Sequence, residues 1–155
     1  MKRMSKIILI VSTSIFVICF MYHWLFPIRL KIIIPKNYQG KITLVLSNVK
    51  SDNLNVNENG IGYITKQTFD GTYYKPIVLE TDGTNISDRI VGFNSSTFWA
   101  IGKASNAFDE NNFRKELEVR YLSFEVVPPC KKGEMQNYRP NLIEFIDQTK
   151  LLFNK

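Results

Sequence analysis

The sequence contains few of the residues that enzymes most often use for catalysis and metal binding. Its 155 residues include two cysteines and one histidine, His23. Zinc clusters, haem attachment and histidine-based acid–base catalysis need more of these residues than the chain contains. Because no histidine follows residue 23, a Ser–His or Cys–His nucleophile is excluded from the rest of the chain. We therefore expect no metal and no cofactor.

The sequence also lacks a cluster of basic residues large enough to bind nucleic acid. There are 20 basic and 14 acidic residues, and five of the basic ones, with no acidic residue, lie within residues 1–31. The rest of the chain is nearly neutral, and charges of both signs are interleaved, as in Arg114-Lys115-Glu116. Phosphate recognition needs a basic stripe on one face. We therefore expect no nucleic-acid partner.

The overall composition is that of one globular domain. Hydrophobic residues make up 45% of the chain and charged residues 22%. Together with the length of 155 residues, these values argue against collagen, a disordered tail and a multidomain enzyme.

A long uncharged segment lies near the N-terminus. Residues 7–26 carry no formal charge, and as a helix they would be about 30 Å long, the thickness of a bilayer's hydrocarbon core. Three basic residues precede the segment, and Tyr22, His23 and Trp24 lie at its far end, where aromatic rings prefer the headgroup level. We predict a transmembrane signal-anchor helix over 7–26. Residues 1–6 would be cytoplasmic and the bulk of a single-pass protein would lie outside the cell membrane, the inner membrane in a Gram-negative cell.

Two other interpretations of this segment stay open. A cleaved secretory signal would need small residues after the apolar run, and residues 21–27 contain none. A buried core helix is the second alternative. A lipoprotein site at Cys19 is not favoured, because Ile18 stands where a small residue is required.

Alternating apolar residues and evenly spaced turns predict β-structure after Pro27. Residues 28–34 and 41–48 have the two-residue period of half-buried strands. Three dipeptides suited to hairpin turns follow at intervals of 11 and 12 residues: Asn59-Gly60, Asp70-Gly71 and Asp82-Gly83. Further strands are predicted over 97–101 and 117–127. The fold class is therefore predicted as mainly β, an antiparallel β-sandwich-like extracytoplasmic domain over 28–139.

The C-terminal residues 140–155 predict a short amphipathic helix. Asn141 can cap it with Glu144 at the third position, and apolar residues follow at helical spacing. We expect this helix to close the sheet, with a partner-binding or membrane-surface role as the alternative. Residues 106–116 fit either a short helix or a loop.

The start of the predicted domain carries a short motif. Residues 34–42 read Ile-Pro-Lys-Asn-Tyr-Gln-Gly-Lys-Ile, and Asn59-Gly60 follows. This pattern resembles the opening of a family of uncharacterised bacterial extracytoplasmic β-domains, whose members begin Ile-Pro-x-Gly-Tyr-x-Gly and carry an Asn-Gly turn near a second strand. Asn37 stands where the family has glycine, and asparagine tolerates the same left-handed backbone. The resemblance is strongest over 32–65 and implies an exported β-rich domain with no assigned activity. The matching residues, which we interpret as structural, are Pro35, Tyr38, Gly40 and Gly60.

Aromatic pairs provide a possible binding surface for sugar or peptide. The residues are Tyr73, Tyr74, Phe98 and Trp99. Because side chains alternate along a strand, one of each pair can equally belong to the core, where large aromatic residues are common.

Two further features have a simple structural explanation beside a functional one. Cys130 is either a free thiol or a thiol that forms a disulfide with a second chain. Residues 82–88 are rich in oxygen ligands but lack the spacing of a calcium loop, so a hairpin turn is preferred.

These observations favour a non-enzymatic, membrane-anchored extracytoplasmic domain that binds a ligand or belongs to an envelope complex. The expected partners are the membrane, another envelope protein and, in a homo-oligomer, a second copy of the chain. The alternative is a small envelope hydrolase that uses carboxylates, although no pair of acidic residues stands out.

Overall fold

The computed structural model describes residues 11–21, 29–71, 74–94, 96–105, 118–139 and 146–151. Residues 11–21 form a helix. The elements that follow it are β1 (Lys31–Ile34), β2 (Gly40–Leu46), β3 (Ile61–Ile64), α2 (Lys66–Gly71), β4 (Ile77–Glu80), β5 (Ile90–Val91), β6 (Ala100–Ser105), β7 (Glu118–Val126) and the 3₁₀ turns η1 (Pro129–Lys131) and η2 (Gln148–Lys150).

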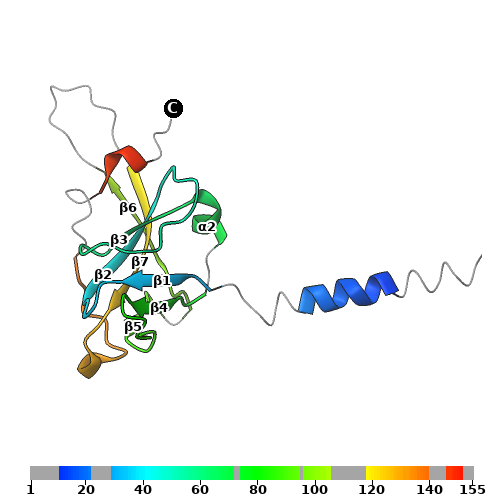
Figure 1. Ribbon diagram of the computed structural model, residues 1–155, viewed down its shortest axis with the longest axis horizontal. Helices are drawn as coiled ribbons and strands as arrows, with labels where there is room; N and C mark the ends of the chain where they lie inside the picture. Colours follow the sequence, from blue (N-terminus) through cyan, green and yellow to red (C-terminus); the bar gives the residue numbers. More distant parts are fainter. Residues whose placement is uncertain are drawn as a thin grey trace, which may run out of the picture.

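The described strands form two sheets. β1 and β4 make a parallel two-stranded sheet. The larger sheet has the order β3-β2-β7-β5, and β6 also pairs with β7. In this sheet β2 and β3 are parallel, whereas β7 is antiparallel to β2, β5 and β6. Figure 1 shows the small sheet running across the direction of β2 and β7.

The prediction of a mainly β fold agrees with these sheets, but the antiparallel β-sandwich is wrong. Both sheets contain parallel pairs, β1 with β4 and β2 with β3. Asn59-Gly60 and Asp82-Gly83 lie at turns, whereas Asp70-Gly71 are the last two residues of α2. A turn dipeptide indicates where the chain reverses, but not which strand the next segment joins. The turn at Gly60 leads into β3, which pairs along its length with β2 in parallel.

Side chains alternate across the larger sheet and supply two apolar clusters. The main core is built by alternate residues of β2 and β7 together with β1 and β4. Its residues from these strands are Ile42, Leu44, Leu46, Leu122, Phe124, Val126, Ile32, Ile34 and Val78. A smaller cluster lies on the opposite face, where Val45, Tyr63 and Val119 pack with Ile146 and Leu151.

The predicted transmembrane helix over 7–26 is corrected by the structure. The helix described covers residues 11–21, which corresponds to about 16 Å, half of the bilayer's hydrocarbon core. Within the described parts of the chain, no helix is long and apolar enough to cross a membrane. The prediction of a single-pass signal anchor is therefore wrong. Residues 7–10 and 22–26 of the predicted helix lie outside the described residues.

The predicted C-terminal amphipathic helix over 140–155 is also wrong. Residues 146–151, the part of this segment that the structure describes, form the 3₁₀ turn η2 and a bridge between Leu151 and Ser47. The carboxylate of Asp147 accepts hydrogen bonds from the Thr149 amide at 3.1 Å and hydroxyl at 2.6 Å. Such local bonds compete with helix formation. The chain instead pairs with the end of β2, because the Asn48 amide donates to the Lys150 carbonyl at 2.8 Å.

Candidate functional site

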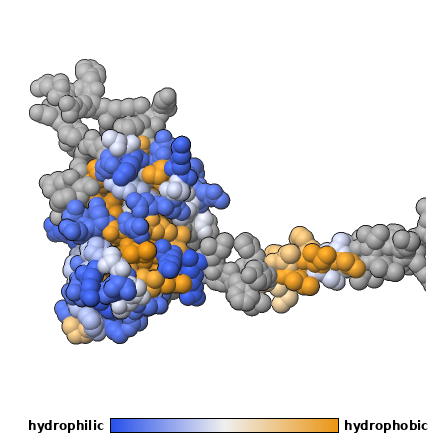
Figure 2. Space-filling view, in the orientation of Figure 1, coloured by the Kyte–Doolittle hydropathy of each residue, from blue (hydrophilic) through white to orange (hydrophobic). Residues whose placement is uncertain are grey.

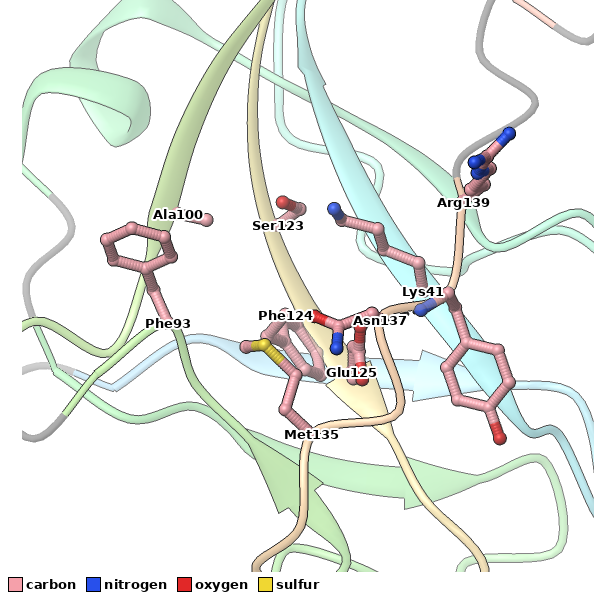
Figure 3. Close-up of a pocket in the computed structure, with 10 residues that line it drawn as sticks. Lys41, Phe93, Ala100, Ser123, Phe124, Glu125, Met135, Asn137 and Arg139 are labelled. Carbon is pink, nitrogen blue, oxygen red and sulfur yellow. Dashed lines mark hydrogen bonds between the residues drawn. The ribbon is translucent and has the colours of Figure 1, made fainter.

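A cavity of about 310 Å³ lies on the face of the larger sheet that points away from the main core (Figure 3). Its floor comes from three adjacent strands. In the sheet register Lys41 of β2 faces Glu125 of β7, and Ala100 of β6 faces Ser123 of β7. Residues 134–139, here called the wall segment, line one side.

Glu125 fastens the wall segment to the sheet. Its side chain is buried, and each carboxylate oxygen accepts one backbone hydrogen bond: from Gln136 at 2.7 Å and from Tyr138 at 2.9 Å. The residue between these donors, Asn137, has a φ of 55°, a left-handed conformation that asparagine tolerates. Hydrogen bonds from amides to a carboxylate are among the stronger kinds. Glu125 thus links the wall segment to β7 through two hydrogen bonds.

Ser123 places an unused hydroxyl in the cavity. The residue is 1% exposed, and among the described residues its Oγ atom has no hydrogen-bond partner. Leaving such a group unpaired costs about 1–3 kcal/mol. Buried polar groups without a partner are uncommon in folded proteins. Ser123 is therefore a donor that is available to a bound molecule.

Two cations line the same cavity. Lys41 extends from β2 along the face that also carries Ser123, and Arg139 lies at the edge (Figure 3). Within the described part of the chain, neither residue forms an ion pair. Glu125 is the lining residue with a negative charge. Two cations against one carboxylate leave the cavity with a net single positive charge.

The remainder of the cavity is apolar and open to solvent. Phe93 is 60% exposed and Met135 is 38% exposed. In the view of Figure 3 these two side chains lie on the side away from Arg139. The cavity therefore has a cationic part and an apolar part, and small-molecule sites commonly combine the two.

Three of the aromatic residues predicted as a binding surface, Tyr74, Phe98 and Trp99, lie outside this cavity. Trp99 is buried, and its ring contacts that of Phe124 edge-on at a centroid distance of 5.4 Å. Phe98 packs against the same core, 5.5 Å from Trp99. Tyr74 is exposed and accepts a hydrogen bond through its carbonyl from the Trp99 indole at 3.0 Å. Tyr73 lies outside the described residues. Phe98 and Trp99 thus belong to the core, and Tyr74, Phe98 and Trp99 do not line the cavity.

Sequence reasoning missed the residues that do line the cavity. A signal for two of them was present, because Ser123 and Glu125 are polar residues at alternate positions of an otherwise apolar strand end. Phe93 and Met135 gave no comparable signal, since they reach the cavity from loops. The positions of these two side chains depend on how residues 92–94 and 96–99 and the wall segment pack on the sheet.

The other candidate residues have structural surroundings. Cys130 is an exposed free thiol in η1, so the interchain disulfide stays a prediction. Asp82 lies at the tip of a turn, where its carboxylate accepts a hydrogen bond from the Thr84 amide at 3.0 Å and pairs with Lys36. The Thr84 hydrogen bonds and the Lys36 charge lower the pKa of Asp82 to about 2. The described residues contain no cluster of three potential metal ligands among His, Cys, Asp and Glu.

Comparison with known proteins gives little further information. No protein-family model matches the chain, and no curated protein matches it. A crystal structure described as "Putative Lipoprotein from Bacillus anthracis" aligns with 14% sequence identity over 64% of this chain and 70% of that chain, with a TM-score of 0.34. A likeness at this level does not show a shared fold.

Proposed function

We propose that this chain is a non-enzymatic binding domain that is exported from the cytoplasm and associates with the membrane. The observation that carries the proposal is the helix over residues 11–21, in which every residue is exposed. Phe16 is 73% exposed, and Ile18 and Phe20 are each 65% exposed. Figure 2 shows the apolar side chains of this helix. A large exposed apolar surface of this kind marks contact with lipid or with another apolar surface.

The residues before this helix support export. Lys2, Arg3 and Lys6 precede an uncharged apolar segment, with no acidic residue among them. A basic start followed by an apolar run is the pattern of export signals. Export would place the folded domain on the outer side of the membrane, and this placement is part of the proposal.

The buried carboxylates support binding over hydrolysis. Glu125 accepts two backbone hydrogen bonds. Glu80 accepts one from the Asn37 amide at 3.1 Å and lies 3.5 Å from the Arg89 guanidinium. A carboxylate that attacks a substrate or transfers a proton must be free to reach it. Because these two are already engaged in holding loops, the carboxylate-based hydrolase is the less well supported alternative.

The proposal is tested by fractionation of cells that express the full chain. We expect the wild-type chain in the membrane pellet after a high-salt wash, and we expect protease added outside spheroplasts to digest its folded domain. A chain with Phe16→Glu and Phe20→Glu should leave the pellet, because two charges on this helix disfavour contact with lipid.

Ile101→Glu is the matched control, since Ile101 is 68% exposed but lies on β6 of the folded domain. This variant should stay in the pellet. Wild-type chain in the soluble fraction, or a domain that the external protease does not reach, would overturn the proposal. The envelope-protein partner and the homo-oligomer expected from the sequence stay predictions.

A further inference from the structure

We propose that the cavity between β7 and the wall segment binds a small organic monoanion, a carboxylate carried by an apolar group. This inference rests on the proposed binding function and names its ligand class.

Lys41 and Ser123 form the anion subsite. Ser123 faces Thr43 across the strand pair, and Lys41 faces Glu125, so Lys41 and Ser123 are diagonal neighbours on one face. Diagonal neighbours lie about 7–8 Å apart, within reach of a long side chain. An anion between them accepts a charge-assisted hydrogen bond from the ammonium and a second bond from the hydroxyl. Its oxygen gives the buried Ser123 hydroxyl the partner that it lacks among the described residues.

The charge of the cavity selects a monoanion. Lys41 and Arg139 supply two positive charges, and Glu125 supplies one negative charge on the same face. A carboxylate balances the net positive charge. A phosphate dianion would exceed it, and Glu125, a cross-strand neighbour of Lys41, would repel the dianion more strongly than a monoanion.

The exposed apolar side chains select an anion with an apolar body. Phe93 and Met135 present their surface to the cavity, and covering that surface favours binding. Methionine adapts to ligands of different shape. A volume of about 310 Å³ lies at the lower end of small-molecule sites, which span roughly 300–1,000 Å³. The part of the ligand that enters the cavity is therefore one ring or a short branched chain.

Binding to the full chain in lipid nanodiscs tests the inference. The probes are para-fluorophenylacetate, a free acid, and N-acetyl-para-fluorophenylalanine, which represents the C-terminus of a peptide. Fluorine NMR follows each probe, and empty nanodiscs correct for partition into lipid. We expect saturable binding of at least one acid, and which acid binds distinguishes a free metabolite from a peptide end. The amide of the second probe and para-fluorobenzyl alcohol should bind at least about tenfold more weakly, because neither carries the anion.

Variants locate the binding in this cavity. Lys41→Gln and Ser123→Ala should each weaken the affinity at least about tenfold. Lys66→Gln is the control, since Lys66 lies on α2 and does not line the cavity, and it should bind as the wild type does. A cooperative thermal unfolding transition in each variant shows that the variant is folded. If Lys41→Gln does not fold, Ser123→Ala gives the same test without removing a charge.

Three results would overturn the inference. The first is the absence of saturable binding of either acid at millimolar concentration. The second is unchanged affinity in both variants. The third is displacement of the bound probe by inorganic phosphate at the same concentration at which the unlabelled acid displaces it. Failure here is distinct from failure of the proposed function. If the chain stays in the membrane pellet but binds neither acid, only the proposed ligand class is wrong. If the chain binds an acid but is soluble inside the cell, only the proposed export and membrane association are wrong.

Discussion

The Tyr38 hydroxyl occupies the position that a side chain at Gly60 would need. A Cβ atom at Gly60 would lie 2.1 Å from the Tyr38 oxygen and 2.4 Å from the Lys41 carbonyl oxygen. The Tyr38 hydroxyl donates to that carbonyl at 2.9 Å, and the Thr43 amide donates to the Gly60 carbonyl at 2.7 Å. The two parts of the sequence motif, 34–42 and the turn at Asn59-Gly60, therefore form one structural unit at the start of β2.

Replacing Gly60 should destabilise the domain strongly. Its φ of 78° is unfavourable for alanine, and the added Cβ atom would also clash with Tyr38 and with the Lys41 backbone. We expect Gly60→Ala to lower the free energy of unfolding by about 2–4 kcal/mol, measured by denaturant titration. Gly71→Ala is the control, because no heavy atom of the described residues lies within 4 Å of its Cβ position. If the two variants are equally stable, the contact between Tyr38 and Gly60 is not present.

Stability should fall at alkaline pH because of Tyr38. Burial raises the pKa of Tyr38 from 10.0 to about 12. Between these values the unfolded chain loses the phenolic proton while the folded chain retains it, so stability is complete below pH 10 and declines as the pH rises toward 12. Denaturant titrations at several pH values should show a smaller decline in Tyr38→Phe. That variant should also lose about 1 kcal/mol at neutral pH with the hydrogen bond to Lys41. Equal declines in the two proteins would contradict this role.

Removing the Ser123 hydroxyl should stabilise the chain when no ligand is present. The hydroxyl is buried without a partner among the described residues, so Ser123→Ala removes a desolvation cost of about 1 kcal/mol or more. Ser47→Ala is the matched control, and it should lower the stability, because the buried Ser47 hydroxyl donates a hydrogen bond to the Ile64 carbonyl at 3.3 Å. Thermal melting of both variants should show an increase for the first and a decrease for the second. A decrease in both would show that Ser123 is already paired.

Glu125→Gln should loosen the wall segment. An amide offers one acceptor oxygen where the carboxylate offers two, and its NH₂ group would face the Gln136 or Tyr138 amide. We expect a loss of about 2–3 kcal/mol and faster hydrogen exchange at these two amides. The exposed Glu134 lies in the same segment, and Glu134→Gln should leave the exchange of both amides unchanged. Unchanged exchange in Glu125→Gln would contradict the fastening role.

The positions of the main strands could be predicted from the sequence, but their pairing could not. Strands β2 and β7 lie close to the predicted ranges 41–48 and 117–127, because alternation of side chains is a local property. Pairing depends on segments that are far apart in sequence, as in the parallel pair of β1 and β4. The two terminal helices were also predicted from local patterns, the N-terminal one from an uncharged apolar run and the C-terminal one from helical spacing. Such patterns permit a helix, but they do not determine where it ends or whether other contacts replace it.

Distant contacts also explain the misassigned turn at Asp70-Gly71. The helix α2 begins where the Thr65 amide donates to the Asp52 carboxylate at 2.7 Å, and the Thr68 hydroxyl donates to the same carboxylate at 2.5 Å. Asp52 lies 13 residues before Thr65. The Asp52 bonds add to a local cap, in which the Thr65 hydroxyl accepts a hydrogen bond from the Thr68 amide at 3.3 Å. A local sequence window contains that cap but does not contain Asp52.

The wall segment has a consequence for how this site can diversify. Among the described residues, its hydrogen bonds to the sheet go to the Glu125 carboxylate, whereas the floor is part of strands that also build the main core. Substitutions in residues 134–139 can thus alter the shape of the cavity without repacking the sheet, provided that Glu125 and two backbone amides are kept. Selection for a new ligand would act first on this segment, and chains with the same floor would differ in what they bind.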